Sequence, residues 1–75
     1  MSSVINQLQK IVIAAADAAD VELGFIMPTE QSTTVQLFID GEERIFRTAI
    51  RNASYETFFN NFKTLKNNSN DTNIH

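Results

Sequence analysis

The chain has 75 residues, a formal net charge of −3 and no cysteine, and 43% of its residues are hydrophobic. This length allows one domain with a core of marginal size, and this composition is typical of a folded chain rather than a disordered one. The absence of cysteine excludes disulfides and thiolate metal sites, while the acidic balance disfavours nucleic acid as a partner.

The first segment has the spacing of an amphipathic helix. From Ser2 to about Ala19, apolar residues recur three or four positions apart, and a serine at the start can cap the first backbone amides. Residues 14–20 are rich in alanine, which favours a helix and lets a neighbouring element approach closely. Asp17 and Asp20 lie where the helix dipole disfavours anions, so either the helix frays there or a cation lies nearby.

Three strands are predicted next. Residues 21–27, 33–39 and 44–50 each show the two-residue alternation or the β-branched and aromatic content of a strand. Pro28 ends the first strand because it cannot donate a ladder hydrogen bond. In that strand, alternation assigns Ile26 to the face opposite the one shared by Val21, Leu23, Phe25 and Met27.

The stretch "DGEE", residues 40–43, joins the second and third strands. A four-residue loop there pairs Leu37 with Phe46. It also pairs Phe38 with Ile45, whereas a two-residue loop sets charged residues opposite these apolar ones. We therefore predict the four-residue loop, as a solvated hairpin tip whose glycine takes a positive φ. Its carboxylates could also bind a hard cation, but they lack the spacing of a calcium loop, so no metal site is predicted.

The chain closes with a second helix and a polar tail. Five apolar residues after the stretch "RNAS" stand at helical spacing: Tyr55, Phe58, Phe59, Phe62 and Leu65. We predict that this stripe packs against the sheet as core rather than serving as a docking face. Residues 67–75 lack periodicity and predict a disordered tail beyond a single domain of residues 1–66.

Together these elements predict an α+β fold with two layers in the order α-β-β-β-α. Its three-stranded antiparallel meander has both helices packed on one face, because that face needs covering and two amphipathic stripes are available. The other face of the sheet is then uncovered. It is predicted to be the interaction site and to carry Gln36, Phe38, Ile45, Arg47 and Ala49, together with Ile26.

An uncovered face of this kind predicts association, because large exposed apolar patches are uncommon on soluble monomers. We expect a small interaction module that binds another protein or itself, with a homodimer as one form. Arg44, Arg47 and Arg51 could bind an acidic partner or pair with nearby glutamates. The alternatives are a phage- or prophage-encoded inhibitor of a nucleic-acid-handling host protein, a protein that binds a small apolar ligand between helices and sheet, and a face that is merely wet.

No catalytic or cofactor-binding site is predicted. The single histidine, His75, lies in the tail, so no Ser–His pair can be assembled, and no carboxylate pair is visibly buried. No stretch approaches the roughly 18 apolar residues of a membrane-spanning helix, and the run from Ile11 to Ala16 is short for a signal peptide. We therefore expect a cytoplasmic protein that is not an enzyme and has neither membrane nor nucleic acid as a partner.

Overall fold

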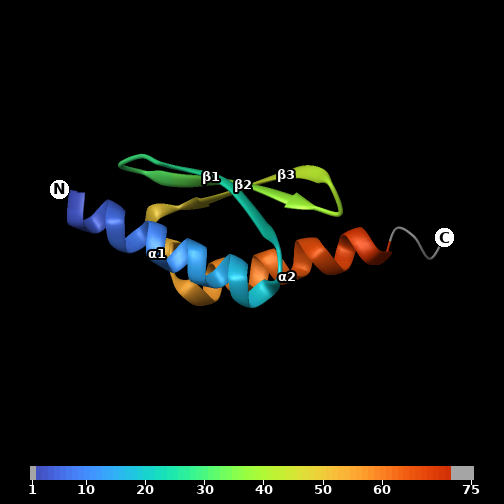
Figure 1. The fold of residues 1–75 in the computed structure, drawn as a ribbon. Coiled ribbons are helices and arrows are strands. Elements are labelled where there is room, and N and C mark those ends of the chain that lie inside the picture. The colour runs from blue at the N-terminus through green and yellow to red at the C-terminus, as the bar shows by residue number, and fades with distance from the viewer. Residues whose placement is uncertain (1, 72–75) are drawn as a thin grey trace.

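A computed structural model of the chain describes residues 2–71. Its elements are α1 (Ser2–Ala19), β1 (Glu22–Pro28), β2 (Ser32–Ile39), β3 (Glu42–Ala49), the 3-10 helix η1 (Ile50–Asn52) and α2 (Tyr55–Asp71). The strands form one layer, and both helices lie in a second layer on one side of it (Figure 1). The predicted α+β fold with the order α-β-β-β-α is therefore confirmed.

The sheet is an antiparallel meander of strand order β1-β2-β3, and its second hairpin has a two-residue loop. Ile39 pairs with Glu42, and the loop residues Asp40 and Gly41 have φ angles of 55° and 81°. Two consecutive positive φ angles define a type I′ turn, which matches the twist of the flanking strands and strongly favours Asp-Gly. The prediction of a four-residue loop is therefore wrong, because the turn chemistry outweighs the gain from apolar cross-strand pairs.

The true register of β2 and β3 differs from the predicted one by two residues. Leu37 pairs with Arg44, and Phe46 pairs with Val35. Phe38, which was predicted to face an isoleucine, pairs with Glu43. A shift of two residues moves no side chain to the other face of the sheet, because the side-chain period of a strand is two. The predicted division of β2 and β3 into inner and outer residues therefore survives the error.

A bulge in β1 changes which residues that strand turns inward. Gly24 and Phe25 together lie opposite the single residue Gln36 of β2. The extra residue inverts the alternation that follows it. Ile26 consequently packs against the core, and Met27 is exposed. The prediction that Ile26 lies on the outer face, opposite Phe25 and Met27, is therefore wrong.

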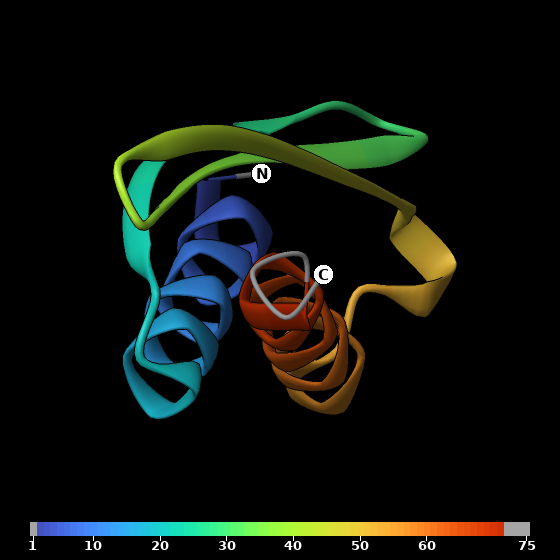
Figure 2. The same cartoon turned by 90° about the vertical axis from the view of Figure 1, so that its right-hand side faces the viewer.

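The core lies between the inner face of the sheet and the two helices, which lie side by side beneath it (Figure 2). Phe58 and Phe62 of α2 are fully buried, and the ring of Phe46 on β3 meets theirs edge-on at centroid distances of 6.0 and 5.9 Å. The predicted packing of the aromatic stripe is thus confirmed for Phe58 and Phe62 and, as partly buried residues, for Phe59 and Leu65. It is wrong for Tyr55, which is 42% exposed. The buried residues of α1 are Leu8, Val12, Ala15, Ala16 and Ala19.

A lysine of α2 contacts the residue that follows the C-terminal end of α1. Asp20 has a φ of 60°, its N–H bonds to the carbonyl of Asp17, and the N–H of Val21 bonds to the carbonyl of Ala16, which together form a Schellman motif. The Lys66 ammonium donates to the Asp20 carbonyl at 2.9 Å and to its carboxylate at 2.7 Å. The hydrogen bond to the carboxylate and the positive charge of Lys66 lower the pKa of Asp20. Of the two expectations for this helix end, the nearby cation is the one observed.

The second helix is longer than predicted. It continues to Asp71, so residues 67–71, which were predicted to begin a disordered tail, are helical. The apolar stripe marks the part of a helix that packs, whereas each further residue of a formed helix adds its own backbone hydrogen bond. Neither proline nor glycine interrupts this stretch. The rest of the predicted tail, residues 72–75, lies outside the described residues.

Candidate interaction surface

The outer face of the sheet is the surface that points away from both helices (Figure 2). In β2, buried residues alternate with partly exposed ones, and the buried set belongs to the core. Gln36 and Phe38 therefore point outward, and Gln36 pairs with Ile45 of β3, which is on the same face. Five of the six predicted site residues share this face: Gln36, Phe38, Ile45, Arg47 and Ala49. Only Ile26 does not.

The outer face exposes large apolar side chains. Ile45, Met27 and Phe25 are 53%, 57% and 43% exposed. Ile45 was predicted here, whereas Met27 and Phe25 were assigned to the inner face. The signal that could have located them is Gly24, because a glycine inside a strand pattern often marks a bulge. The uncovered apolar surface is thus larger than the sequence indicated.

Gly24 also lets two side chains lie flat across the outer face. A β-carbon at this position would fall 2.2 Å from the Gln36 side-chain oxygen and 3.0 Å from the Phe38 ring. Gln36 in addition donates a hydrogen bond from its amide nitrogen to the Glu43 carboxylate. The Gln36 side chain therefore lies over Gly24 of β1 and contacts Glu43 of β3, which places a polar group beside the apolar groups of the face.

The three arginines of the third strand region separate in the structure. Arg47 lies on the outer face and donates from Nε to the Ser32 hydroxyl at 3.3 Å. Arg44 lies on the helix side of the sheet and pairs with Glu42 at 2.9 Å, which is one of the predicted pairings. Arg51 lies in η1, beyond the strand. Of the three, only Arg47 adds a cation to the outer face.

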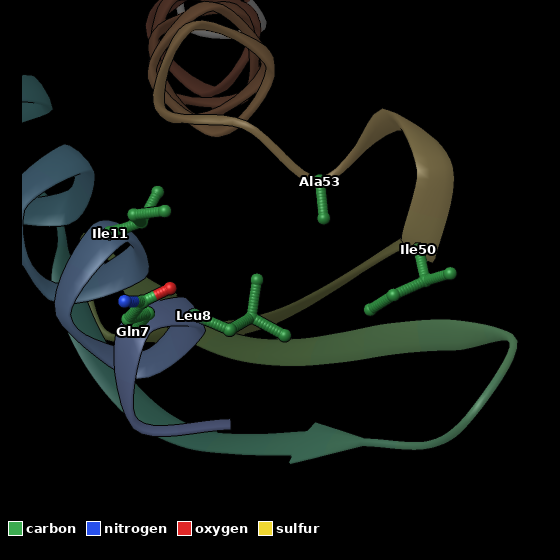
Figure 3. Close-up of a pocket in the computed structure, with 5 residues that line it drawn as sticks. All are labelled: Gln7, Leu8, Ile11, Ile50 and Ala53. Atoms are coloured by element: carbon green, nitrogen blue, oxygen red, sulfur yellow. The ribbon is translucent and has the colours of Figure 1, made fainter. Parts of the chain in front are cut away.

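A shallow pocket opens at one end of the core, between the first half of α1 and the segment around η1 (Figure 3). Its apolar lining comes from Leu8, Ile11, Ile50 and Ala53, and Gln7 adds an amide. The volume of about 180 Å³ lies below the roughly 300–1,000 Å³ of typical ligand sites. It also lies away from the alanine-rich part of α1, whose inward residues are buried in the core. The pocket therefore supports ligand binding less strongly than the outer face supports association.

Comparison with known proteins adds no functional information. No family model, curated protein or solved structure matches this chain. Within residues 2–71, no three His, Cys, Asp or Glu side chains gather in a way that could hold a metal ion. None of the helices in that range is both long enough and apolar enough to cross a membrane. The functional argument therefore depends on the chemistry of the surface.

Proposed function

We propose that this chain is a small non-enzymatic protein-interaction module that binds a partner protein through the outer face of its sheet. The observation that carries this proposal is the exposure of Phe25, Met27 and Ile45 on a face that neither helix covers. Large exposed apolar patches are uncommon on soluble monomers and mark sites of association, so three exposed apolar side chains on one face support this proposal. The cysteine-free sequence supports a cytoplasmic location.

The composition of the outer face matches the anatomy of a protein–protein interface. Aromatic residues, methionine and arginine are enriched at such interfaces, and this face holds Phe25, Phe38, Met27 and Arg47. Methionine and phenylalanine supply the apolar contact area, and the flexible methionine adapts to the shape of a partner. The Gln36 amide, which donates a hydrogen bond to the Glu43 carboxylate, adds the polar groups that such interfaces also contain.

A matched pair of substitutions tests this proposal. Ile45 on the outer face and Ile13 on α1 are 53% and 54% exposed, so glutamate at either position is expected to leave the fold intact. Immobilised wild-type protein is used to isolate a partner, whose affinity for purified variants is then measured. We expect Ile45→Glu and Met27→Glu each to weaken binding by at least about tenfold, because each buries a charge in the interface. Ile13→Glu should bind as the wild type does.

The binding of the two sheet variants, compared with that of the α1 variant, shows which layer holds the binding surface. If Ile45→Glu and Met27→Glu bind the partner as tightly as Ile13→Glu does, the outer face is not the binding surface and the proposal fails. Loss of binding in Ile13→Glu alone would instead place the site on the helical layer. Far-UV circular dichroism melts of all three variants establish that each is folded.

A further inference from the structure

The two edges of the sheet differ in how well they can accept another strand. β1 carries the bulge at Gly24 and Phe25 and ends at Pro28, and both features hinder the addition of a strand. β3 forms the other edge and pairs with β2 residue for residue from Glu42 to Ala49, with neither bulge nor proline. The edge of β3 therefore presents a regular row of backbone groups to solvent.

The register establishes which backbone groups of β3 point to the free edge. The N–H of Ile50, directly after β3, bonds to the carbonyl of Gln31 on the side of β2. Because backbone direction alternates along a strand, the even-numbered residues of β3 also point toward β2. The N–H and C=O groups of Glu43, Ile45 and Arg47 consequently point away from the sheet, toward the free edge.

The side chains at these three positions are self-complementary under a two-fold rotation. An axis at Ile45 that runs antiparallel copies of β3 past each other sets Ile45 opposite the partner's Ile45. It also sets Glu43 opposite the partner's Arg47, and this pair occurs twice. An axis at Arg44 or at Arg47 would set like charges directly opposite each other, which is destabilising. An axis at Phe46 would set Arg47 opposite the partner's Ile45. The charges therefore select the register centred on Ile45.

We propose that this chain forms a homodimer by antiparallel pairing of β3 with β3 of a second copy, centred on Ile45. The pairs at Glu43, Ile45 and Arg47 each exchange two backbone hydrogen bonds, because the groups of all three residues point outward. The two three-stranded sheets then join into one, and their outer faces become a single continuous surface. This inference goes beyond the proposed function, because it uses the backbone edge of β3, while Phe25 and Met27 on β1 remain accessible to a partner.

Charge reversal at the paired positions tests the dimer. Sedimentation equilibrium of the wild-type chain should give twice the monomer mass of 8.5 kDa. Arg47→Glu and Glu43→Arg each turn both ion pairs into like-charge contacts, so each should raise the dissociation constant by at least about tenfold. An equimolar mixture of the two single variants should regain the dimer, because opposite charges then face each other throughout. Arg51→Glu changes the charge equally outside the strand and should leave the dimer intact.

The rescue by mixing distinguishes the β3 edge from any general effect of charge or of folding. A wild-type chain that sediments as a monomer at every attainable concentration would overturn the proposal. A dimer that both single reversals leave unchanged would overturn it too. Dissociation by Met27→Glu, with the charge reversals silent, would place self-association on the outer face instead. If the wild-type chain forms the dimer but binds no partner protein, the proposed function is refuted and the dimer is not.

Discussion

The two faces of the sheet hold similar residues but meet different surroundings. Phe46 and Ile45 are neighbours on β3, yet the Phe46 ring packs between two phenylalanines of α2 while Ile45 is 53% exposed. On β2, Val35 and Leu37 are fully buried and Gln36 between them is not. The two helices cover one face only, so apolar side chains on the other face stay exposed. Position relative to the helices, rather than residue type, therefore decides which apolar side chains of the sheet are buried.

The largest expected difference in the free energy of unfolding is that between Phe62→Ala and Ile45→Ala. Phe62 is fully buried, so its truncation leaves a cavity and should cost about 3–5 kcal/mol of unfolding free energy. That is a large share of the roughly 5–15 kcal/mol that stabilises a natural domain, so this variant should be largely unfolded when warm. Ile45→Ala should cost about 1 kcal/mol or less, because half of the side chain is already in water. Urea denaturation followed by circular dichroism measures both, and equal losses would contradict the assignment of the two faces.

Two neighbouring threonines, one on each face of the sheet, should differ in how their replacement changes stability. Thr33 points inward and is fully buried, and its hydroxyl has no hydrogen-bond partner among the described residues. Thr33→Val removes this unpaired polar group at nearly constant volume and should stabilise the fold by about 1–2 kcal/mol. Thr34→Val makes the same change on the outer face and should alter stability by less than about 0.5 kcal/mol. A loss of stability in Thr33→Val, read from the urea midpoint, would mean that the hydroxyl is satisfied.

Substitutions in the turn between β2 and β3, which sets the register of these strands, should change stability by less. Gly41 has a φ of 81°, and no described atom beyond its two chain neighbours lies within 4 Å of the place a β-carbon would occupy. Gly41→Ala should therefore cost about 1 kcal/mol through backbone strain alone. Gly41→Asn should cost less, because asparagine tolerates positive φ. Thermal unfolding of the two variants side by side measures the difference, and identical melting curves would argue against a strained turn.

The smallest effect concerns the ion pair between the helices beneath the inner face. Lys66 lowers the pKa of Asp20, so the pair adds stability above the ordinary aspartate pKa, and this contribution is lost as the pH falls through the lowered value. The Asp20 side chain is 92% exposed, so the contribution is small. Asp20→Asn keeps the positive φ and should flatten the acid limb of the stability curve. Lys66→Met should flatten the same limb, and an unchanged limb in both variants would remove any role for the pair.

Much of the fold was predictable from local pattern. The first helix was predicted from Ser2 to about Ala19 and has those bounds, and Pro28 ends β1 as expected. The start of α2 at Tyr55 also agrees, because its aromatic residues follow helical spacing over several turns. Among the predicted surface residues, Phe38 and Ile45 lie on the outer face despite the wrong register, since an error of two residues preserves the face.

The remaining features arise where one residue changes the pattern. The bulge at Gly24 and Phe25 adds one residue to β1, which turns Ile26 inward and Met27 outward. A strictly alternating pattern cannot predict such an extra residue. Side-chain pairs predict the wrong hairpin loop, because the two-residue turn is favoured by the strand twist that two positive φ angles provide. The extent of α2 was missed because apolar periodicity reports packing rather than backbone hydrogen bonding.

The order and type of the two α-helices and three strands follow from the amino-acid sequence alone, since the periodicities of 3.6 and 2 are local properties of the chain. The 3-10 helix η1, at Ile50–Asn52, has no such periodicity and was not predicted. Three features are instead set by tertiary contacts: which residues of β1 face the core, which edge of the sheet is regular, and how much apolar surface stays uncovered. These depend on how strands align and on what two helices can cover, and both are contacts between distant residues that no local pattern encodes.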